Sequence, residues 1–330
     1  MPLRNFAVIS LACVLLTGWG HWGPPVKIGL ALDQSRGREV LSREIKEDLE
    51  GNRAELILRD AEGSSTTQER QVGDLLAQGI QALVILPVDP KKSGSLVEAA
   101  HKTGIKVISL ERLIPTGGLD YLIAFDDIKT GELQAKAMVE KHPKGTFALF
   151  TGNDGSRIRE GQFKGLSPYT EKGEIQVVSS LSAKNPLTPA QAAKEAEALL
   201  KPEKFHVDAV LASNNLRAQG TVLALEKEGL AGKVPVAGVG EDMESCRRIH
   251  AGTQTLTIYD SPKKLGEETA YLSAKIARKA TQFDCQFTDV ETKDGKTLAV
   301  YLSPKVVDGK NLESTIIKDG VQKKEDVYGK

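Results

Sequence analysis

The stretch AELILRDAEGSSTTQERQVGDLLAQGIQALVILP, residues 54–87, decides the fold class of this chain. It opens with a short apolar run at 54–60 and closes with a second one at 82–87. Between the two runs, four apolar side chains recur at helical spacing and fall on one face: Val72, Leu75, Leu76 and Ile80. The stretch therefore predicts a strand, a helix and a second strand.

The same alternation continues along the chain. Eight further apolar runs, rich in Val, Ile and Leu, lie at 26–32, 106–110, 121–125, 146–152, 175–180, 207–213, 234–240 and 254–260. Continuous rather than alternating apolar strands are typical of a parallel sheet that helices cover on both faces. The runs fall into two series, which predicts two doubly wound α/β lobes.

Local signals agree with this class of fold. Thr188 is a suitable N-cap for the helical segment that starts at Pro189, because proline fits the first turn of a helix. Late in the chain, Asp294-Gly295 lies between β-prone flanks and predicts a hairpin turn.

Size and charge limit the functions to be considered. The 330 residues suffice for two lobes, each with its own core, and 40% hydrophobic with 27% charged residues is typical of a soluble globular protein. Lys plus Arg and Asp plus Glu both number 44. Without a basic surplus to bind a phosphate backbone, we expect no nucleic-acid partner.

The N-terminus predicts export. Residues 1–23 combine Arg4, an apolar run from Phe6 to Leu16 that is too short to span a bilayer, and small residues after it, as in a signal peptide. Cys13 leaves a lipoprotein anchor as an alternative that the residues before it favour less. After export, Cys246 and Cys285 would meet oxidising conditions, and the sequence leaves open whether they pair.

Polar residues follow strand after strand, at the edge where ligands bind in open parallel sheets. They are Asp33 to Arg36, Asp89, Glu111-Arg112, Asp126-Asp127, Asn153-Asp154, Ser213 to Asn215, Gly240 to Asp242 and Asp260. Two such edges that face each other would form a cleft for a ligand rich in hydroxyl groups. The alternative is that these residues only cap the helices that follow the strands.

Catalytic patterns are lacking. None of the histidines combines with Cys or Asp at metal-ligand spacing, and the sequence contains neither a phosphate-binding loop nor a G-x-S-x-G motif. The stretch GVGEDM at 238–243 lacks the third glycine of a dinucleotide-binding motif. We therefore expect a protein that is not an enzyme and needs no cofactor or metal.

Four segments carry a resemblance to a known family. They are IAFDDIKTGELQAKAMV (123–139), VLASNNLRAQGTVLALEKEGLAGKVPVAGV (210–239), RRIHAGTQTLTIYDSP (247–262) and STIIKDG (314–320). Together they resemble the type I periplasmic sugar-binding proteins of ABC transporters, most of all the xylose-binding members. The resemblance runs from about Val26 to Gly320. It implies a periplasmic monomer whose two lobes close on one sugar and present it to a membrane permease.

The resemblance also implies where the chain crosses between the lobes: near Asp126, at Tyr259 to Ser261 and at Ser303-Pro304. This gives a signal peptide at 1–23, an N-terminal lobe of 24–126 with 261–303, and a C-terminal lobe of 127–260 with 304–330. No DNA-binding segment precedes the first strand, unlike in the related lactose-repressor type.

The family's sugar-binding positions carry over one by one. Arg112 matches an arginine that hydrogen-bonds the sugar, and we expect Glu111 to steady it. Arg36 or Arg38 matches an arginine of the first loop. In the second lobe, Asn153, Asp154 and Asn214 match polar ligand-binding residues.

Other positions depart from the family. Val239-Gly240 replaces a Gln-Asp pair that holds a key carboxylate, so Glu241 or Asp242 is expected to reach in from further along the loop. Asp260 stands where the family has a lysine. Both tryptophans, Trp19 and Trp22, lie at or near the signal segment, so the family's pocket tryptophans are missing.

These departures make a ligand other than xylose the expectation, within the class of monosaccharides and their derivatives. Alternatives are a sensory binding protein that signals to a membrane receptor or kinase, a periplasmic enzyme on the same fold, and a member that has lost its ligand.

Overall fold

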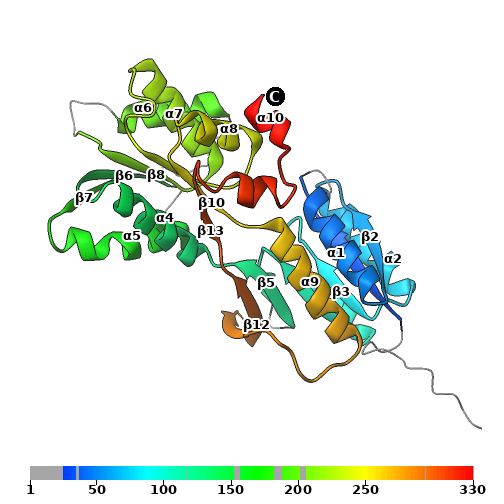
Figure 1. The fold of residues 1–330 in the computed structure, drawn as a ribbon. Coiled ribbons are helices and arrows are strands. Elements are labelled where there is room, and N and C mark those ends of the chain that lie inside the picture. Colours follow the sequence, from blue (N-terminus) through cyan, green and yellow to red (C-terminus); the bar gives the residue numbers. More distant parts are fainter. Residues whose placement is uncertain are drawn as a thin grey trace, which may run out of the picture.

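The computed structural model describes residues 25–34, 37–116, 118–151, 157–181, 188–200, 206–293 and 295–329 (Figure 1). These residues form two lobes, each built on one sheet of mostly parallel strands with helices on both faces. The predicted fold class is therefore confirmed.

The first sheet has seven strands in the order β11-β12-β5-β4-β3-β1-β2. The elements of this lobe are β1 (Val26–Leu32), α1 (Glu39–Gly51), β2 (Ala54–Asp60), α2 (Ser65–Ala77), β3 (Ala82–Ile85), α3 (Gly94–Lys102), β4 (Lys106–Leu110), β5 (Tyr121–Phe125), α9 (Pro262–Ala277), β11 (Thr288–Thr292) and β12 (Gly295–Leu302). Helices α1 and α9 cover one face, and α2 and α3 cover the other.

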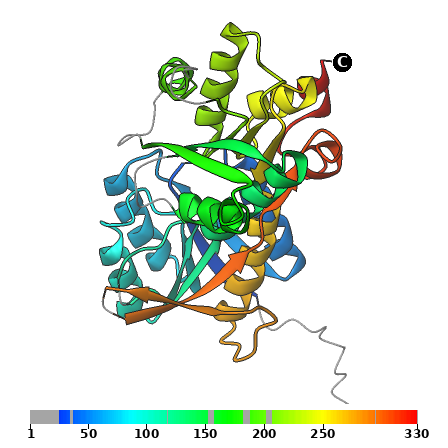
Figure 2. The same ribbon diagram turned by 90° about the vertical axis from the view of Figure 1, so that its left-hand side faces the viewer.

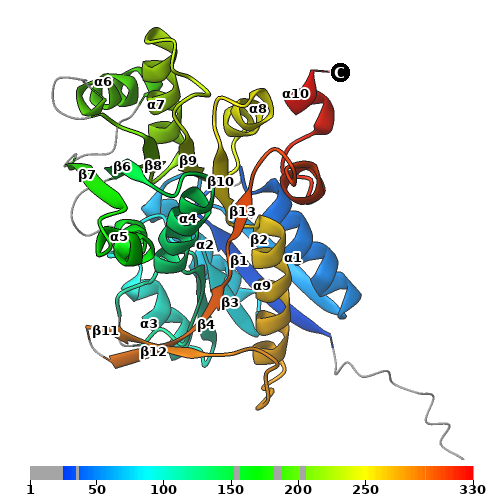
Figure 3. The same ribbon diagram turned by 60° about the vertical axis from the view of Figure 1, so that its left-hand side comes forward.

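The second sheet has six strands in the order β13-β10-β9-β8-β6-β7 (Figure 3). Its lobe contains α4 (Asp127–Lys141), β6 (Gly145–Thr151), α5 (Arg157–Thr170), β7 (Ile175–Leu181), α6 (Pro189–Leu199), β8 (Ala209–Ala212), α7 (Asn215–Lys227), β9 (Val236–Val239), α8 (Met243–Ala251), β10 (Leu256–Tyr259), β13 (Lys305–Val307), a π-helical turn (Glu313–Ile317) and α10 (Lys324–Tyr328). Helices α4 and α5 pack on one face of this sheet, and α6 and α7 pack on the other.

The opening stretch folds as predicted. Strands β2 and β3 lie on either side of β1 and parallel to it, and α2 connects them. On that helix Val72 and Leu75 are buried, and Ile80 beyond its end lies so close to Gly29 that a Cβ there would be 2.7 Å from it. This approach explains the glycine in the middle of the first strand.

Two further local predictions are confirmed. The Thr188 side chain accepts a hydrogen bond of 3.2 Å from the backbone N–H of Gln191, as an N-cap does. Strands β11 and β12 pair antiparallel, with Thr292 opposite Gly295 (Figure 2). Asp294 of the predicted turn lies outside the described residues.

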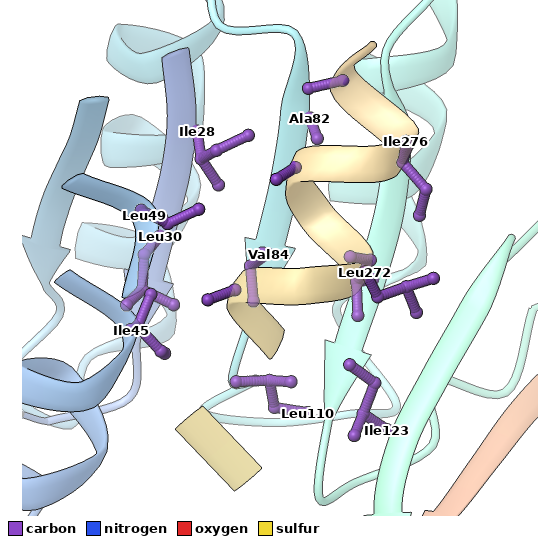
Figure 4. Packing of buried hydrophobic residues seen from close by; sticks show 14 of the residues in the cluster. Ile28, Leu30, Ile45, Leu49, Ala82, Val84, Leu110, Ile123, Leu272 and Ile276 are labelled. Atoms are coloured by element: carbon purple, nitrogen blue, oxygen red, sulfur yellow. The ribbon is translucent and has the colours of Figure 1, made fainter. Parts of the chain in front are cut away.

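The core of the first lobe joins strands and helices from both ends of the chain. Ile28 and Leu30 of β1 pack with Ile45 and Leu49 of α1, and Leu272 of α9 packs into the same cluster (Figure 4). All five side chains are at most 1% exposed. Fully burying such side chains stabilises the fold by ~1.5–3 kcal/mol each, so α9 is bound to this lobe although it follows β10 of the other one.

Consequently, the chain passes between the sheets three times: after β5, after β10 and between β12 and β13. The two cysteines do not pair, because buried Cys246 and partly buried Cys285 are both free thiols. The predicted signal segment, 1–23, lies outside the described residues. Among those that are described, no helix is both long and apolar enough to cross a membrane.

Candidate ligand-binding site

Four charged side chains form a network at the carboxyl ends of β1 and β4 in the first lobe. Arg38 donates two hydrogen bonds to the Glu111 carboxylate, of 2.7 and 2.9 Å. Arg112 contacts the buried Asp33 at 3.0 Å and donates a hydrogen bond of 2.7 Å to the carbonyl oxygen of Pro87. Two predicted site residues, Arg38 and Arg112, are thus held by acids of their own lobe at the edge where ligands bind in such sheets.

The expectation that Glu111 steadies Arg112 is wrong. Glu111 pairs with Arg38, and Arg112 pairs with Asp33 instead. The backbone of Glu111 is in the left-handed region, with φ 56°, as the chain turns directly after β4. Neighbouring side chains diverge at such a turn, so adjacency in the sequence does not become contact.

Asn214 acts as the N-cap of α7. Its Oδ1 accepts a hydrogen bond of 2.9 Å from the backbone N–H of Arg217. Asp242 likewise caps α8, where its carboxylate accepts a hydrogen bond of 2.6 Å from the backbone N–H of Ser245. One side-chain oxygen of each residue is therefore used to cap a helix, as the helix-cap alternative expects. A role of Asn214 in ligand binding stays a prediction, and it would depend on the Nδ2 group as a donor.

The neighbouring Asn215 was named in the strand-end pattern but not among the predicted site residues. Its Oδ1 is buried and has no hydrogen-bond partner. The side chain lies against Gly240, where a Cβ would be 2.4 Å from Nδ2, and Gly240 has φ 116°. The Asn214-Asn215 repeat in the sequence was the available signal, because a second amide directly after a capping residue serves no capping purpose itself.

Glu241 and Asp260 come close to each other and to the first lobe. Burial, together with the negative charges of Glu111 and Asp242, raises the pKa of Glu241 to about 7, although Arg38 opposes the rise. Burial, together with the negative charges of Glu241, Asp127 and Glu111, raises the pKa of Asp260 to about 8. Because Glu111 and Arg38 belong to the first lobe and Glu241 to the second, the two carboxyl edges face each other here.

Buried polar atoms without partners gather at the same edge of the second sheet. They are Oγ1 of Thr151 at the end of β6, Oδ1 of Asn215 after β8, and Oδ1 of Asp260 after β10. An unsatisfied buried polar group costs about 1–3 kcal/mol, and native proteins contain few of them. Three of them at the ends of strands in one sheet therefore indicate a place that a polar ligand completes.

Asp127 was named in the strand-end pattern but not among the predicted site residues. Desolvation raises its pKa, Arg157 lowers it in part, and Asp126 raises it. Asp126 itself caps α4, where its carboxylate accepts a hydrogen bond of 3.0 Å from the backbone N–H of Ile128. Arg36, Asn153 and Asp154 lie outside the described residues.

The described residues hold no group of three or more His, Cys, Asp or Glu side chains that could bind a metal ion. Two histidines contact single acids, at 2.8 Å between His101 and Asp120 and at 3.1 Å between His206 and Asp208. His101 is in the last turn of α3, and His206 precedes β8. Both pairs are therefore away from the strand ends described above.

Residues 34–281 match the periplasmic binding protein domain family. The chain is 33% identical to the D-xylose-binding periplasmic protein of Escherichia coli K12, covering 99% of this chain and 100% of that protein. It is 34% identical to the D-xylose-binding periplasmic protein of Haemophilus influenzae, covering 92% of each. An ABC transporter solute-binding protein from Clostridium phytofermentans, solved with bound β-D-glucose, shares the fold with a TM-score of 0.72 at 22% identity, over 91% of this chain and 99% of that one.

The family match covers most of the chain, and two sugar-binding transport proteins align with more than nine-tenths of it. This chain therefore belongs to the periplasmic binding proteins and is a binding protein rather than an enzyme.

Proposed function

We propose that this protein captures a monosaccharide or a monosaccharide derivative between its lobes and delivers it to an ABC permease. The observation that carries the proposal is the set of three buried, unpartnered polar atoms at the ends of β6, β8 and β10. The carboxyl edge of the first sheet carries two arginines, Arg38 and Arg112, that are held by acids of their own lobe. The sugar-binding relatives, which align along almost the whole chain, support this reading.

In this proposal Arg38 and Arg112 bind hydroxyl groups of the ligand. A guanidinium group has five N–H donors in a fixed plane. Arg38 uses two of them on Glu111, and Arg112 donates to Pro87 and contacts Asp33. The remaining N–H donors belong to side chains that these contacts already hold in place. Little rotamer entropy is therefore lost when a ligand binds to them.

The lobes would move about the three chain crossings, with a first lobe of 24–126 and 261–303 and a second of 127–260 and 304–330. Closure would bring Glu111 and Arg38 toward Glu241 and Asp260 and remove water from the ligand. A permease can tell the liganded protein from the free one because the ligand shifts the population toward the closed form.

The periplasmic location in this proposal follows the names of two relatives, and the monomeric state is part of the proposal itself. Residues 1–23 act as a signal peptide, and the mature chain works as a periplasmic monomer. Residues 153 and 154 would complete the second-lobe wall, and Arg36 the first-lobe wall.

A thermal-shift screen of the mature protein against pentoses, hexoses, sugar acids and polyols tests the function. A ligand present at 100 times its Kd should stabilise the folded state by ~2.7 kcal/mol. The shift should disappear in Arg112→Ala. It should persist in Arg70→Ala, which removes an exposed arginine of α2 that pairs only with Asp74 at 3.1 Å.

A cooperatively melting protein that responds to no compound in the screen would contradict the proposal. Equal ligand shifts in Arg112→Ala and Arg70→Ala would contradict the role of Arg112 and leave the function standing.

A further inference from the structure

Three acidic side chains lie close together where the lobes join. Asp127 begins α4 after the first chain crossing, Asp260 lies in the second crossing, and Glu241 lies between β9 and α8. The charges of Glu241 and Asp127 both raise the pKa of Asp260, and Glu111 of the first lobe has the same effect. Within the described part of the chain, no side chain forms a hydrogen bond or ion pair with the carboxyl group of Asp127, Glu241 or Asp260, whereas Gln322 donates a hydrogen bond of 2.9 Å to the backbone oxygen of Glu241.

The nearby cations do not neutralise this group of acids. Arg38, the cation that acts on Glu241, gives both of its terminal nitrogens to Glu111. Arg112 forms an ion pair with Asp33 and donates a hydrogen bond to the carbonyl oxygen of Pro87. Arg157 of α5 lowers the pKa of Asp127 in part, whereas the charges that act on Asp260 are all negative. The junction between the lobes therefore holds a group of acids whose negative charge, once they ionise, the described residues leave uncompensated.

Oδ1 of Asp260 is the sharpest feature of this group, because it is buried and accepts no hydrogen bond. Oδ1 of Asn215, on the same edge, is a second buried acceptor without a donor. Both atoms require a donor, and an ionised carboxylate requires a positive charge as well. A neutral hydroxyl group supplies one donor and no charge, whereas a primary ammonium supplies three donors and the charge. The described residues are not arranged to hold a metal ion there.

We propose that the ligand is a polyhydroxylated amine, such as an amino sugar, whose ammonium group binds between Asp260 and Glu241. Its hydroxyl groups would then lie toward Arg38 and Arg112 of the first lobe. This inference rests on the proposed capture function and specifies its ligand class.

The titration behaviour of the site is consistent with this ligand. Burial raises the pKa of Asp260 to about 8 and that of Glu241 to about 7, so the free site holds protons near neutral pH. A bound ammonium favours the charged carboxylates and lowers both values. Binding at pH 7 should therefore release protons, which calorimetry detects as a dependence of the binding heat on the buffer's ionisation enthalpy.

Isothermal titration calorimetry with matched sugars tests the proposal. The pairs are D-glucosamine with D-glucose and D-galactosamine with D-galactose, and N-acetyl-D-glucosamine serves as an uncharged control. We expect an amino sugar to bind at least ten times more tightly than its hydroxyl counterpart or the acetylated form. Asp260→Asn and Glu241→Gln should each reduce that preference toward one, with melting curves confirming that both variants fold.

Asp289→Asn is the matched control, since it removes one negative charge from the exposed β11, where Asp289 pairs with Lys296 at 3.1 Å. It should leave the amine preference unchanged. Tight binding of a neutral sugar without an amine preference would overturn the ligand class and leave the capture function intact. Binding of no member of either pair would contradict the amine ligand class, whereas the capture function is contradicted only if the wider thermal-shift screen also gives no response.

Discussion

Asp260 occupies the short connection between β10 and α9, and one of its carboxylate oxygens is buried without a partner. The sequence indicated this residue in two ways, as a polar residue directly after a strand and as a replacement for an expected lysine. Its neighbours could not be predicted in the same way, since Glu241 and Glu111 reach it from other elements and from the other lobe. The pairing of Arg38 with Glu111, 73 positions apart, likewise depends on a left-handed turn that no local pattern announces.

The raised pKa of Asp260 has a consequence for stability. In the unfolded chain an aspartate titrates near ~3.9, whereas burial raises the pKa of folded Asp260 to about 8. Between these values the folded state holds a proton that the unfolded state has released. The free energy of unfolding of the ligand-free protein should therefore fall as the pH rises from ~4 to ~8.

Asp260→Asn should remove this contribution. We expect the variant to match the wild type near pH 4 and to exceed it at pH 8 by on the order of 1 kcal/mol, or ~2–4 °C in melting temperature. Thermal melts of both proteins across this pH range measure the difference. A constant difference between pH 4 and pH 8 would show that Asp260 does not titrate as described.

At the scale of elements, the sequence predicted most of the fold, because continuous apolar strands and helical spacing are local signals. It did not reveal how closely α4 and α5 pack. A Cβ at Gly161 of α5 would lie 2.0 Å from the backbone oxygen of Ile128, and a Cβ at Gly131 of α4 would lie 2.0 Å from that of Ile158. A glycine in a helix shows such a role only once its partner helix is known.

Gly161→Ala should therefore destabilise the protein, because the added methyl group would overlap the backbone of α4. The overlap would push α4, which begins with Asp127, away from α5. We expect a loss of at least ~1–3 kcal/mol, as for overpacked cores, in urea unfolding followed by circular dichroism. Gly73→Ala is the control, since Gly73 lies in α2 with nothing within 4 Å of an added Cβ. It should stabilise by ~0.4–1 kcal/mol. Equal effects of the two substitutions would contradict the close packing.

At the scale of the whole molecule, the chain passes between the two sheets after β5, after β10 and between β12 and β13. The resemblance to binding proteins implies that such crossings join two lobes. Neither pattern nor resemblance indicated what fixes the second crossing. The C-terminal tail packs on the second lobe through Leu312, Ile316 and Val327. From this tail, Asp319 accepts hydrogen bonds from Tyr259 Oη at 2.8 Å and from Ser261 Oγ at 2.7 Å, on either side of Asp260. The tail thus holds the segment that carries the site's central acid.

Asp319→Ala should destabilise the protein and weaken ligand binding together. The substitution leaves the hydroxyl group of Tyr259 buried with only the long 3.4 Å contact to Ser261, and losing such a partner costs ~1–3 kcal/mol. Asp326→Ala, at an exposed position of α10, is the control and should stay within ~0.5 kcal/mol of the wild type. Urea unfolding and ligand titration of both variants measure the two effects. The second crossing carries Asp260, so we expect stability and affinity to fall together. A variant that loses stability but keeps full affinity would show that the tail stabilises the second lobe without influencing the ligand-binding site.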